Sequence, residues 1–122
     1  MEKKVLVVDD DPDICELIQV ALSTKGYVVK VVQTGTEGIE NAGTFLPDLI
    51  LLDMTLPDME GTEVAKKIKG METGKKAPIL LMSGRGLVRS EVDSTLFAGV
   101  LNKPFSLTDL AREADKYASD YR

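Results

Sequence analysis

The sequence of 122 residues contains no histidine, no tryptophan and only one cysteine, Cys15. A single cysteine cannot form a disulfide within the chain, and the lack of histidine excludes a metal site built from cysteine and histidine. Any metal ion bound by this chain must therefore be held by oxygen atoms, which carboxylates and backbone carbonyls supply.

Long apolar runs and an excess of basic residues are also missing. The apolar stretches are too short to span a membrane, and acids interrupt the N-terminal segment MEKKVLVVDDD, which lacks a signal-peptide pattern. Fifteen basic residues against twenty acidic ones give a formal net charge of -5, which opposes direct binding to nucleic acid or membrane surfaces. We expect a cytoplasmic protein that binds neither directly.

Enough apolar residues are present, at 43%, to form a real core in a chain of this length. We find no internal repeat, linker or low-complexity tract, and there is no room for a second domain. The expected organisation is one domain over residues 1–122.

Short apolar segments alternate with segments of helical pattern along the chain. The expected strands are residues 4–9, 27–32, 48–53, 78–83 and 99–102. The expected helices run from Pro12 to near Gly26, through Ile39 and Ala42, over 62–69, weakly over 87–95, and onward from Ser106. This alternation predicts an α/β protein with a parallel sheet and helices on both faces.

The stretch from Pro47 to Gly61 contains the leading site candidate. The apolar run 49–52 ends in Asp53, and a turn segment with Pro57 and Gly61 follows at once. Ligands of open α/β sheets bind at the carboxyl ends of the strands, which is where Asp53 is expected.

Other predicted strand ends carry polar side chains as well. Asp9 and Asp10 end the first strand, Ser83 ends the fourth, and Lys103 follows the fifth. Two unit charges ~4 Å apart interact by about 4 kcal/mol at a surface-like dielectric, so the gathered carboxylates need a compensating cation. Lys103 is one such cation, and Mg²⁺ suits the oxygen-rich pocket. An aspartate in this setting is able to attack phosphorus and form an acyl phosphate.

The chain resembles the response regulator receiver domain of two-component signalling, of the single-domain type. The motifs VVDDDP, LLDMTLPDMEG, MSG and NKPF occur in the family's order and at its separations. The resemblance implies a flavodoxin-like, doubly wound sheet of five parallel strands in a (βα)5 arrangement, with strand order 2-1-3-4-5.

The resemblance also implies a role for each matching residue. Asp53 would accept a phosphoryl group from a phosphohistidine on a sensor histidine kinase or histidine phosphotransfer protein. Mg²⁺ would be bound by Asp10, by Asp9 directly or through water, by Asp53, and by the backbone carbonyl of Thr55. Lys103 would pair with the phosphoryl oxygens, aimed by a cis peptide before Pro104.

The family's activity is signalling by phosphorylation rather than ordinary enzyme catalysis. The domain would assist its own phosphotransfer and dephosphorylation, and Ser83 would move to hydrogen-bond the new phosphoryl group. The face of the fourth helix, fifth strand and fifth helix would then bind an unknown downstream protein, or the phosphoryl group would pass onward in a phosphorelay.

Three positions depart from or vary within the family pattern. Val100 occupies the place of a Tyr or Phe whose ring turns inward during switching, so the readout of phosphorylation is expected to differ here. Thr55 and Arg85 flank the entry path for attacking water, and we expect Arg85 to alter the lifetime of the acyl phosphate. Asp58 and Glu60 are expected to be solvated loop charges, whereas Asp11 is expected to cap a helix.

Alternatives from other classes are weaker but remain open. A phosphorylation-independent interaction module is consistent with Val100 and the weak fourth helix, and a receiver cut from a longer regulator would leave the same sequence. A hydrolase of the haloacid dehalogenase type needs a second acid where Thr55 stands. A flavodoxin would place flavin phosphate against Asp9 to Asp11, which would repel it.

Overall fold

The computed structural model describes residues 2–73 and 76–120, and it contains one five-stranded parallel sheet. The strands are β1 (Lys4–Val8), β2 (Val28–Val32), β3 (Leu49–Asp53), β4 (Ile79–Ser83) and β5 (Gly99–Asn102). Their order in the sheet is β2-β1-β3-β4-β5, and every neighbouring pair is parallel. The predicted fold class and strand order are confirmed, and each strand agrees with its predicted limits to within one residue.

The sheet is apolar on both faces because alternate residues of its central strands enter two separate cores. Leu6, Ile50 and Ile79 belong to the core on one face, and Leu51 and Leu80 to the core on the other. The register places Leu6 beside Ile50 and Ile50 beside Ile79, so residues of like orientation form rows across the sheet. Continuous apolar runs of this kind are expected where helices cover both faces of a parallel sheet.

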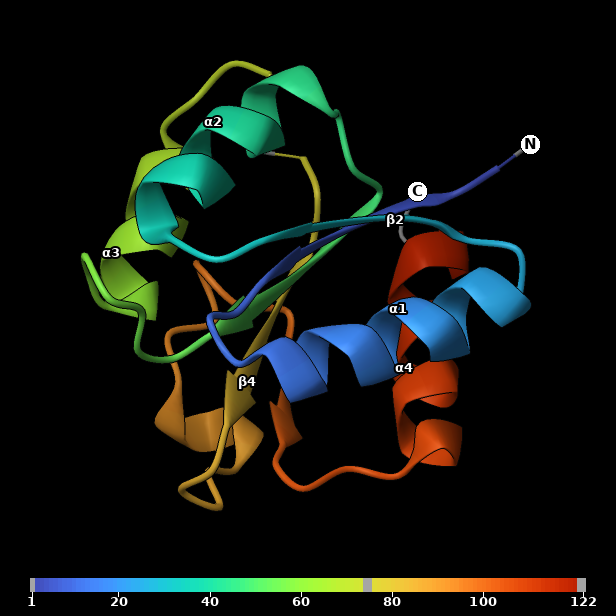
Figure 1. The fold of residues 1–122 in the computed structure, drawn as a ribbon. Coiled ribbons are helices and arrows are strands. Elements are labelled where there is room, and N and C mark those ends of the chain that lie inside the picture. The colour runs from blue at the N-terminus through green and yellow to red at the C-terminus, as the bar shows by residue number, and fades with distance from the viewer. Residues whose placement is uncertain (1, 74–75, 121–122) are drawn as a thin grey trace.

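Helices cover both faces of the sheet, as Figure 1 shows. The helices α1 (Pro12–Thr24) and α4 (Leu107–Asp120) pack on one side, and α2 (Gly35–Thr44) and α3 (Gly61–Lys69) on the other. Asp11 caps α1 as predicted, since its carboxylate accepts hydrogen bonds from the Asp13 and Ile14 backbone N–H groups. Within the described residues, no helix combines the length and apolar character needed to cross a membrane.

The expected fourth helix over residues 87–95 is absent, which corrects the (βα)5 arrangement. A short 3-10 turn, η1 (Arg89–Glu91), takes its place, and the expected fifth helix is therefore α4. A local interaction explains the difference, because the Asp93 carboxylate accepts hydrogen bonds from the Thr95 backbone N–H and hydroxyl. Side chains that bond to their own backbone in this way favour turns over helix.

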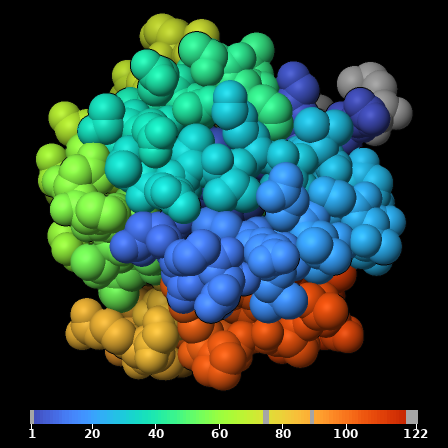
Figure 2. Space-filling view, in the orientation of Figure 1, coloured from blue at the N-terminus to red at the C-terminus, as the bar shows by residue number. Residues whose placement is uncertain are grey.

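The helices α2 and α3 lie side by side and form one continuous surface in the space-filling view (Figure 2). Their packing is close because Gly35, the first residue of α2, lies against the side chains of Met59 and Val64. A Cβ atom at Gly35 would stand only 2.5 Å from Cγ of Met59. The start of α2 is thus held against the segment that leads into α3.

The two-sided core predicts a large difference between two identical substitutions. Leu51 is fully buried in β3, whereas Leu107 is 52% exposed at the start of α4. We expect Leu51→Ala to lower the free energy of unfolding by about 2–5 kcal/mol, because it leaves a cavity in the core. Leu107→Ala should change it by less than about 1 kcal/mol. Urea unfolding followed by circular dichroism measures both, and equal losses would contradict the proposed core.

Candidate functional site

The carboxyl ends of the central strands bring the predicted site residues to one edge of the sheet. Asp53 is the last residue of β3, Ser83 is the last of β4, and Asp9 directly follows β1. The backbone N–H of Asp9 still donates to the Val32 carbonyl at 3.1 Å, which extends the strand alignment by one residue. Parallel pairing therefore gathers side chains that are far apart in the sequence.

Lys103 lies between two of the carboxylates. Its Nζ is 2.9 Å from Oδ2 of Asp9 and 3.2 Å from Oδ1 of Asp53. The Asp9 side chain is fully buried, and those of Asp53 and Lys103 are 15% and 21% exposed. A charge buried to this extent needs a partner of opposite sign, and the Lys103 ammonium is that partner for Asp9.

Asp9, Asp10 and Asp53 together form a group able to hold a metal ion. One carboxylate oxygen from each residue lies within 4.8 Å of the others, and Asp10 is exposed to solvent. Carboxylates with access to water suit Mg²⁺, which keeps part of its water shell when bound to proteins. The donor set therefore fits the hard cation predicted from the sequence.

The surroundings of Asp53 disfavour its ionised form. Burial, followed by the negative charge of Asp9, raises the pKa of Asp53 above its ordinary value, and the Lys103 ammonium offsets this only in part. Burial also acts against the charged form of Lys103, but its hydrogen bond to Asp9 and the two carboxylate charges raise the Lys103 pKa overall. The site thus holds excess negative charge that a bound cation would relieve.

Ser83 is buried beside these charges. Its hydroxyl accepts a hydrogen bond from the Arg85 backbone N–H at 3.1 Å and contacts Sδ of Met54 at 3.7 Å. Its backbone carbonyl accepts from the Lys103 N–H at 2.6 Å, which ties the end of β4 to the segment after β5. The cis peptide expected between Lys103 and Pro104 is present.

Cys15 lies behind the site and takes no part in a metal cluster. Its thiol donates to the backbone carbonyl of Asp9 at 3.1 Å from within the core beneath α1. Burial, helped by the charge of Asp9, raises the pKa of Cys15 to about 11, so the thiol stays protonated at neutral pH. Cys15 is therefore a residue of the core rather than of the site.

The segment between β3 and α3 is folded back on itself. The Gly61 N–H donates to the Met54 carbonyl at 2.7 Å, and the Leu56 N–H donates to the Met59 carbonyl at 3.1 Å. Gly61 also touches the strand end, because a Cβ at this position would lie 2.5 Å from the carbonyl oxygen of Asp53. Thr55, the predicted source of a carbonyl ligand, is held inside this loop.

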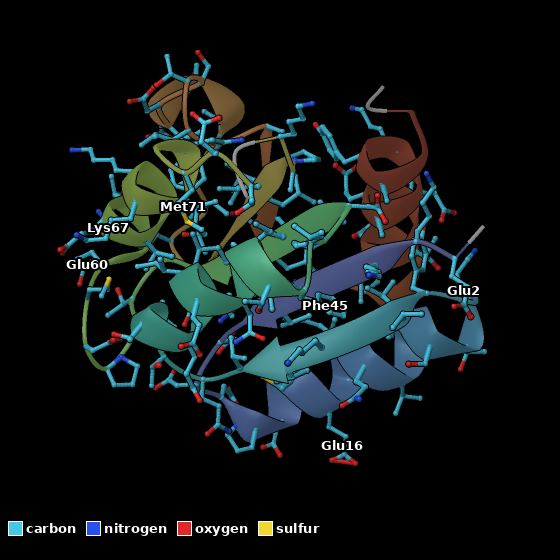
Figure 3. All side chains as sticks on the ribbon, turned by 90° about the horizontal axis from the view of Figure 1, so that it is seen from above. Glu2, Glu16, Phe45, Glu60, Lys67 and Met71 are labelled. Atoms are coloured by element: carbon cyan, nitrogen blue, oxygen red, sulfur yellow. The ribbon has the colours of Figure 1, made fainter. Side chains whose placement is uncertain are left out.

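Asp58 is exposed in the loop, as expected, but it is not only a solvated charge. Its carboxylate accepts hydrogen bonds from the N–H groups of Gly35 and Thr36, at 2.7 and 3.0 Å, and from the Thr36 hydroxyl at 2.7 Å. These bonds lower the pKa of Asp58 to about 2. The partners lie at the start of α2, 22 residues or more away in sequence, and no local pattern around Asp58 indicates them. Glu60 is exposed as expected, at the rim where α3 begins (Figure 3).

The positions that vary from the family pattern are placed on three different segments. Val100 is half-buried in β5, and Arg85 is exposed in the segment after β4. Thr55 is exposed, and its hydroxyl lies 3.4 Å from Oε1 of Glu60. The expected effects of these residues on switching and on acyl-phosphate lifetime stay predictions.

Comparisons of the sequence and of the structure with known proteins identify the family of this chain. The response regulator receiver domain family model matches residues 5–115, and this chain belongs to that family. Response regulator MprA of Mycobacterium tuberculosis is 36% identical over 113 residues, which cover 90% of this chain and 48% of that protein. The chain thus spans about half the length of the curated relatives it matches.

Solved structures with this fold include two from other bacteria. The chemotaxis response regulator CheY4 of Vibrio cholerae is 28% identical with a TM-score of 0.89, over 96% of this chain and 99% of that one. The receiver domain of sensor histidine kinase PA1611 from Pseudomonas aeruginosa is 26% identical with a TM-score of 0.87, over 98% and 100% of the two chains. That structure has a magnesium ion coordinated in its active site cleft.

The raised pKa of Asp53 predicts that its ionised form destabilises the fold. A folded-state pKa above the unfolded one means that the cost is absent at low pH and appears as the pH rises past both values. Without divalent metal at pH 7, Asp53→Asn should therefore unfold at a higher urea concentration than the wild type. The gain should shrink as the pH falls below the raised pKa and be nearly absent below the ordinary value of 3.8. Asp109→Asn is the control, since hydrogen bonding to Arg112 lowers the Asp109 pKa and no gain is expected.

The lowered pKa of Asp58 predicts a pH dependence of opposite sign. Its stabilising contribution should be complete above the ordinary value of 3.8 and should vanish as the pH falls through about 2. The urea midpoint of the wild type should exceed that of Asp58→Asn by a constant amount from pH 7 to about 5. The difference should decrease below about pH 4. A difference independent of pH down to 2.5 would refute a charge-dependent cap.

Proposed function

We propose that Asp53 is the phosphoacceptor of this receiver domain and that Mg²⁺ assists the transfer. The observation that carries the proposal is the group of three carboxylates, two of which contact one lysine, with Lys103 Nζ 2.9 Å from Asp9 and 3.2 Å from Asp53. Asp9, Asp10, Asp53 and the Thr55 carbonyl are the proposed metal ligands. The ion would neutralise negative charge on the phosphoryl oxygens and on the acidic cluster.

The transfer begins with a phosphohistidine on a sensor histidine kinase or histidine phosphotransfer protein. A carboxylate oxygen of Asp53 attacks phosphorus as the bond from phosphorus to the imidazole nitrogen breaks. The bonding pair returns to that nitrogen, and Asp53 becomes an acyl phosphate. Lys103 already contacts Asp53 and is able to pair with the incoming oxygens, so the main contributions are positioning and charge neutralisation. Such partners would meet this domain in the cytoplasm.

Phosphorylation of Asp53 would signal by changing a surface that binds another protein. The new group adds negative charge and strong acceptors beside Ser83, whose hydroxyl is within the same strand-end cluster. A shift of Ser83 toward the phosphoryl group would pull on the segment after β4, to which it is bonded through Arg85. The surface formed by residues 87–98, β5 and α4 is the proposed binding face for a downstream protein. Val100 belongs to β5 and hence to this face, so the domain would switch without the aromatic ring that the family often has at this position.

Mass spectrometry tests the proposed phosphoacceptor directly. Incubation with Mg²⁺ and acetyl phosphate should add the mass of one phosphoryl group, about 80 Da, to the wild type by the transfer chemistry described. Asp53→Asn should abolish the adduct, because an amide is a poor nucleophile toward phosphorus, and removal of Mg²⁺ with EDTA should reduce its formation at least about tenfold. Asp109→Asn should keep the adduct, since its contacts are confined to the start of α4.

A different result would select the alternative function. If neither acetyl phosphate nor any phosphorylated histidine kinase produced an adduct that depends on Asp53, the domain would act as a phosphorylation-independent interaction module. The absence of a helix between β4 and β5 is the observation that favours this second candidate.

A further inference from the structure

The loop between β3 and α3 is anchored at two places. At its base, Gly61 packs on the carbonyl of Asp53 and donates to the carbonyl of Met54. At its tip, Asp58 bonds to the N-terminus of α2 through three hydrogen bonds of 2.7–3.0 Å. Thr55 lies between these anchors and pairs with Glu60 across the loop. Displacing the tip would therefore strain the backbone around Thr55.

Hydrogen bonds from Asp58 and apolar packing by Met59 join the tip of the loop to α2. Asp58 satisfies the N–H groups of Gly35 and Thr36, and the Thr34 hydroxyl satisfies that of Glu37. The first three N–H groups of α2 thus all have acceptors, two of them supplied by the loop. Met59, the next residue along, packs directly on Gly35. A carboxylate is also favoured at this end of a helix by the helix dipole.

We propose that Asp58 is a positioning residue for the metal site, which holds the Thr55 carbonyl in place by tying the loop to α2. The inference rests on the proposed function, because it takes Thr55 as a ligand of Mg²⁺. Groups that orient metal ligands from outside contribute strongly to affinity, and their loss typically weakens binding by about 10–100-fold. The tie also links metal binding to α2, because a change at Thr55 reaches the helix through Asp58.

The Mg²⁺ dependence of adduct formation tests this role. Asp58→Ala should raise the half-saturating Mg²⁺ concentration about tenfold, and Asp58→Asn about threefold, since asparagine keeps one acceptor oxygen. At saturating Mg²⁺ the rates of all variants should agree within about twofold, because Asp58 touches neither the phosphoryl group nor Asp53. A residue that only stabilised the fold would leave the Mg²⁺ requirement unchanged.

The matched control is Asp109→Asn. Like Asp58, Asp109 places a carboxylate at the start of a helix and has a lowered pKa, but it belongs to the first turn of α4 and its partners, Ser106 and Arg112, lie in its own segment. It should leave the Mg²⁺ requirement at the wild-type value even if it lowers the urea midpoint. Thr36→Val weakens the contact between Asp58 and α2 by changing the residue on α2 instead of Asp58. It removes one of the three bonds to Asp58 and should raise the half-saturating Mg²⁺ concentration about twofold, with the main chain of the loop unaltered.

Magnetic resonance separates failure of this inference from failure of the proposed function. In the wild type, Mg²⁺ titration should shift the amide signals of Gly35 and Thr36, and Asp58→Ala should remove those shifts while weakening binding. Unchanged Mg²⁺ affinity in Asp58→Ala, Asp58→Asn and Thr36→Val would overturn the positioning role. A wild type that binds Mg²⁺ but forms no adduct dependent on Asp53 would overturn the proposed function alone, because the titration still measures the effect of Asp58.

Discussion

The ion pair between Lys103 and Asp9 is the interaction on which the edge of the sheet depends. Asp9 is fully buried at the end of β1, and the Lys103 ammonium lies 2.9 Å away. A buried charge without this partner would impose a severe desolvation cost. The same ammonium reaches Asp53, so one cation links the carboxyl ends of β1, β3 and β5. The arrangement leaves an excess of carboxylates, which is also what makes the edge receptive to a metal ion.

Most of the fold could be predicted from the sequence because the strands are buried on both faces. Runs such as 49–52 and 79–82 are apolar without interruption, and each ends in a polar residue that marks the edge of the sheet. Since parallel strands end together, the residue pattern alone was enough to assign Asp53 and Ser83 to one edge. The neighbours of Asp53 followed from the same rule and from the resemblance to a family.

The parts that could not be predicted depend on contacts between distant segments or on close competition between local structures. Asp58 has the appearance of an ordinary turn residue, and only the fold brings the start of α2 within reach of its carboxylate. The segment 87–95 contains two valines at helical spacing, but the Asp93 carboxylate bonds to the backbone and hydroxyl of Thr95 instead. A periodic pattern of two residues is too weak to prevail over such bonds.

Gly61 shows why a glycine can be required without unusual torsion angles. It begins α3 outside the left-handed region, so its backbone conformation alone would admit any L-amino acid. The obstacle is the carbonyl oxygen of Asp53, which occupies the space of a side chain. Relatives should therefore carry a larger residue at this position only where the start of α3 lies further from the end of β3. In this chain, a side chain at Gly61 would push directly against Asp53, whose carboxylate lies at the centre of the site.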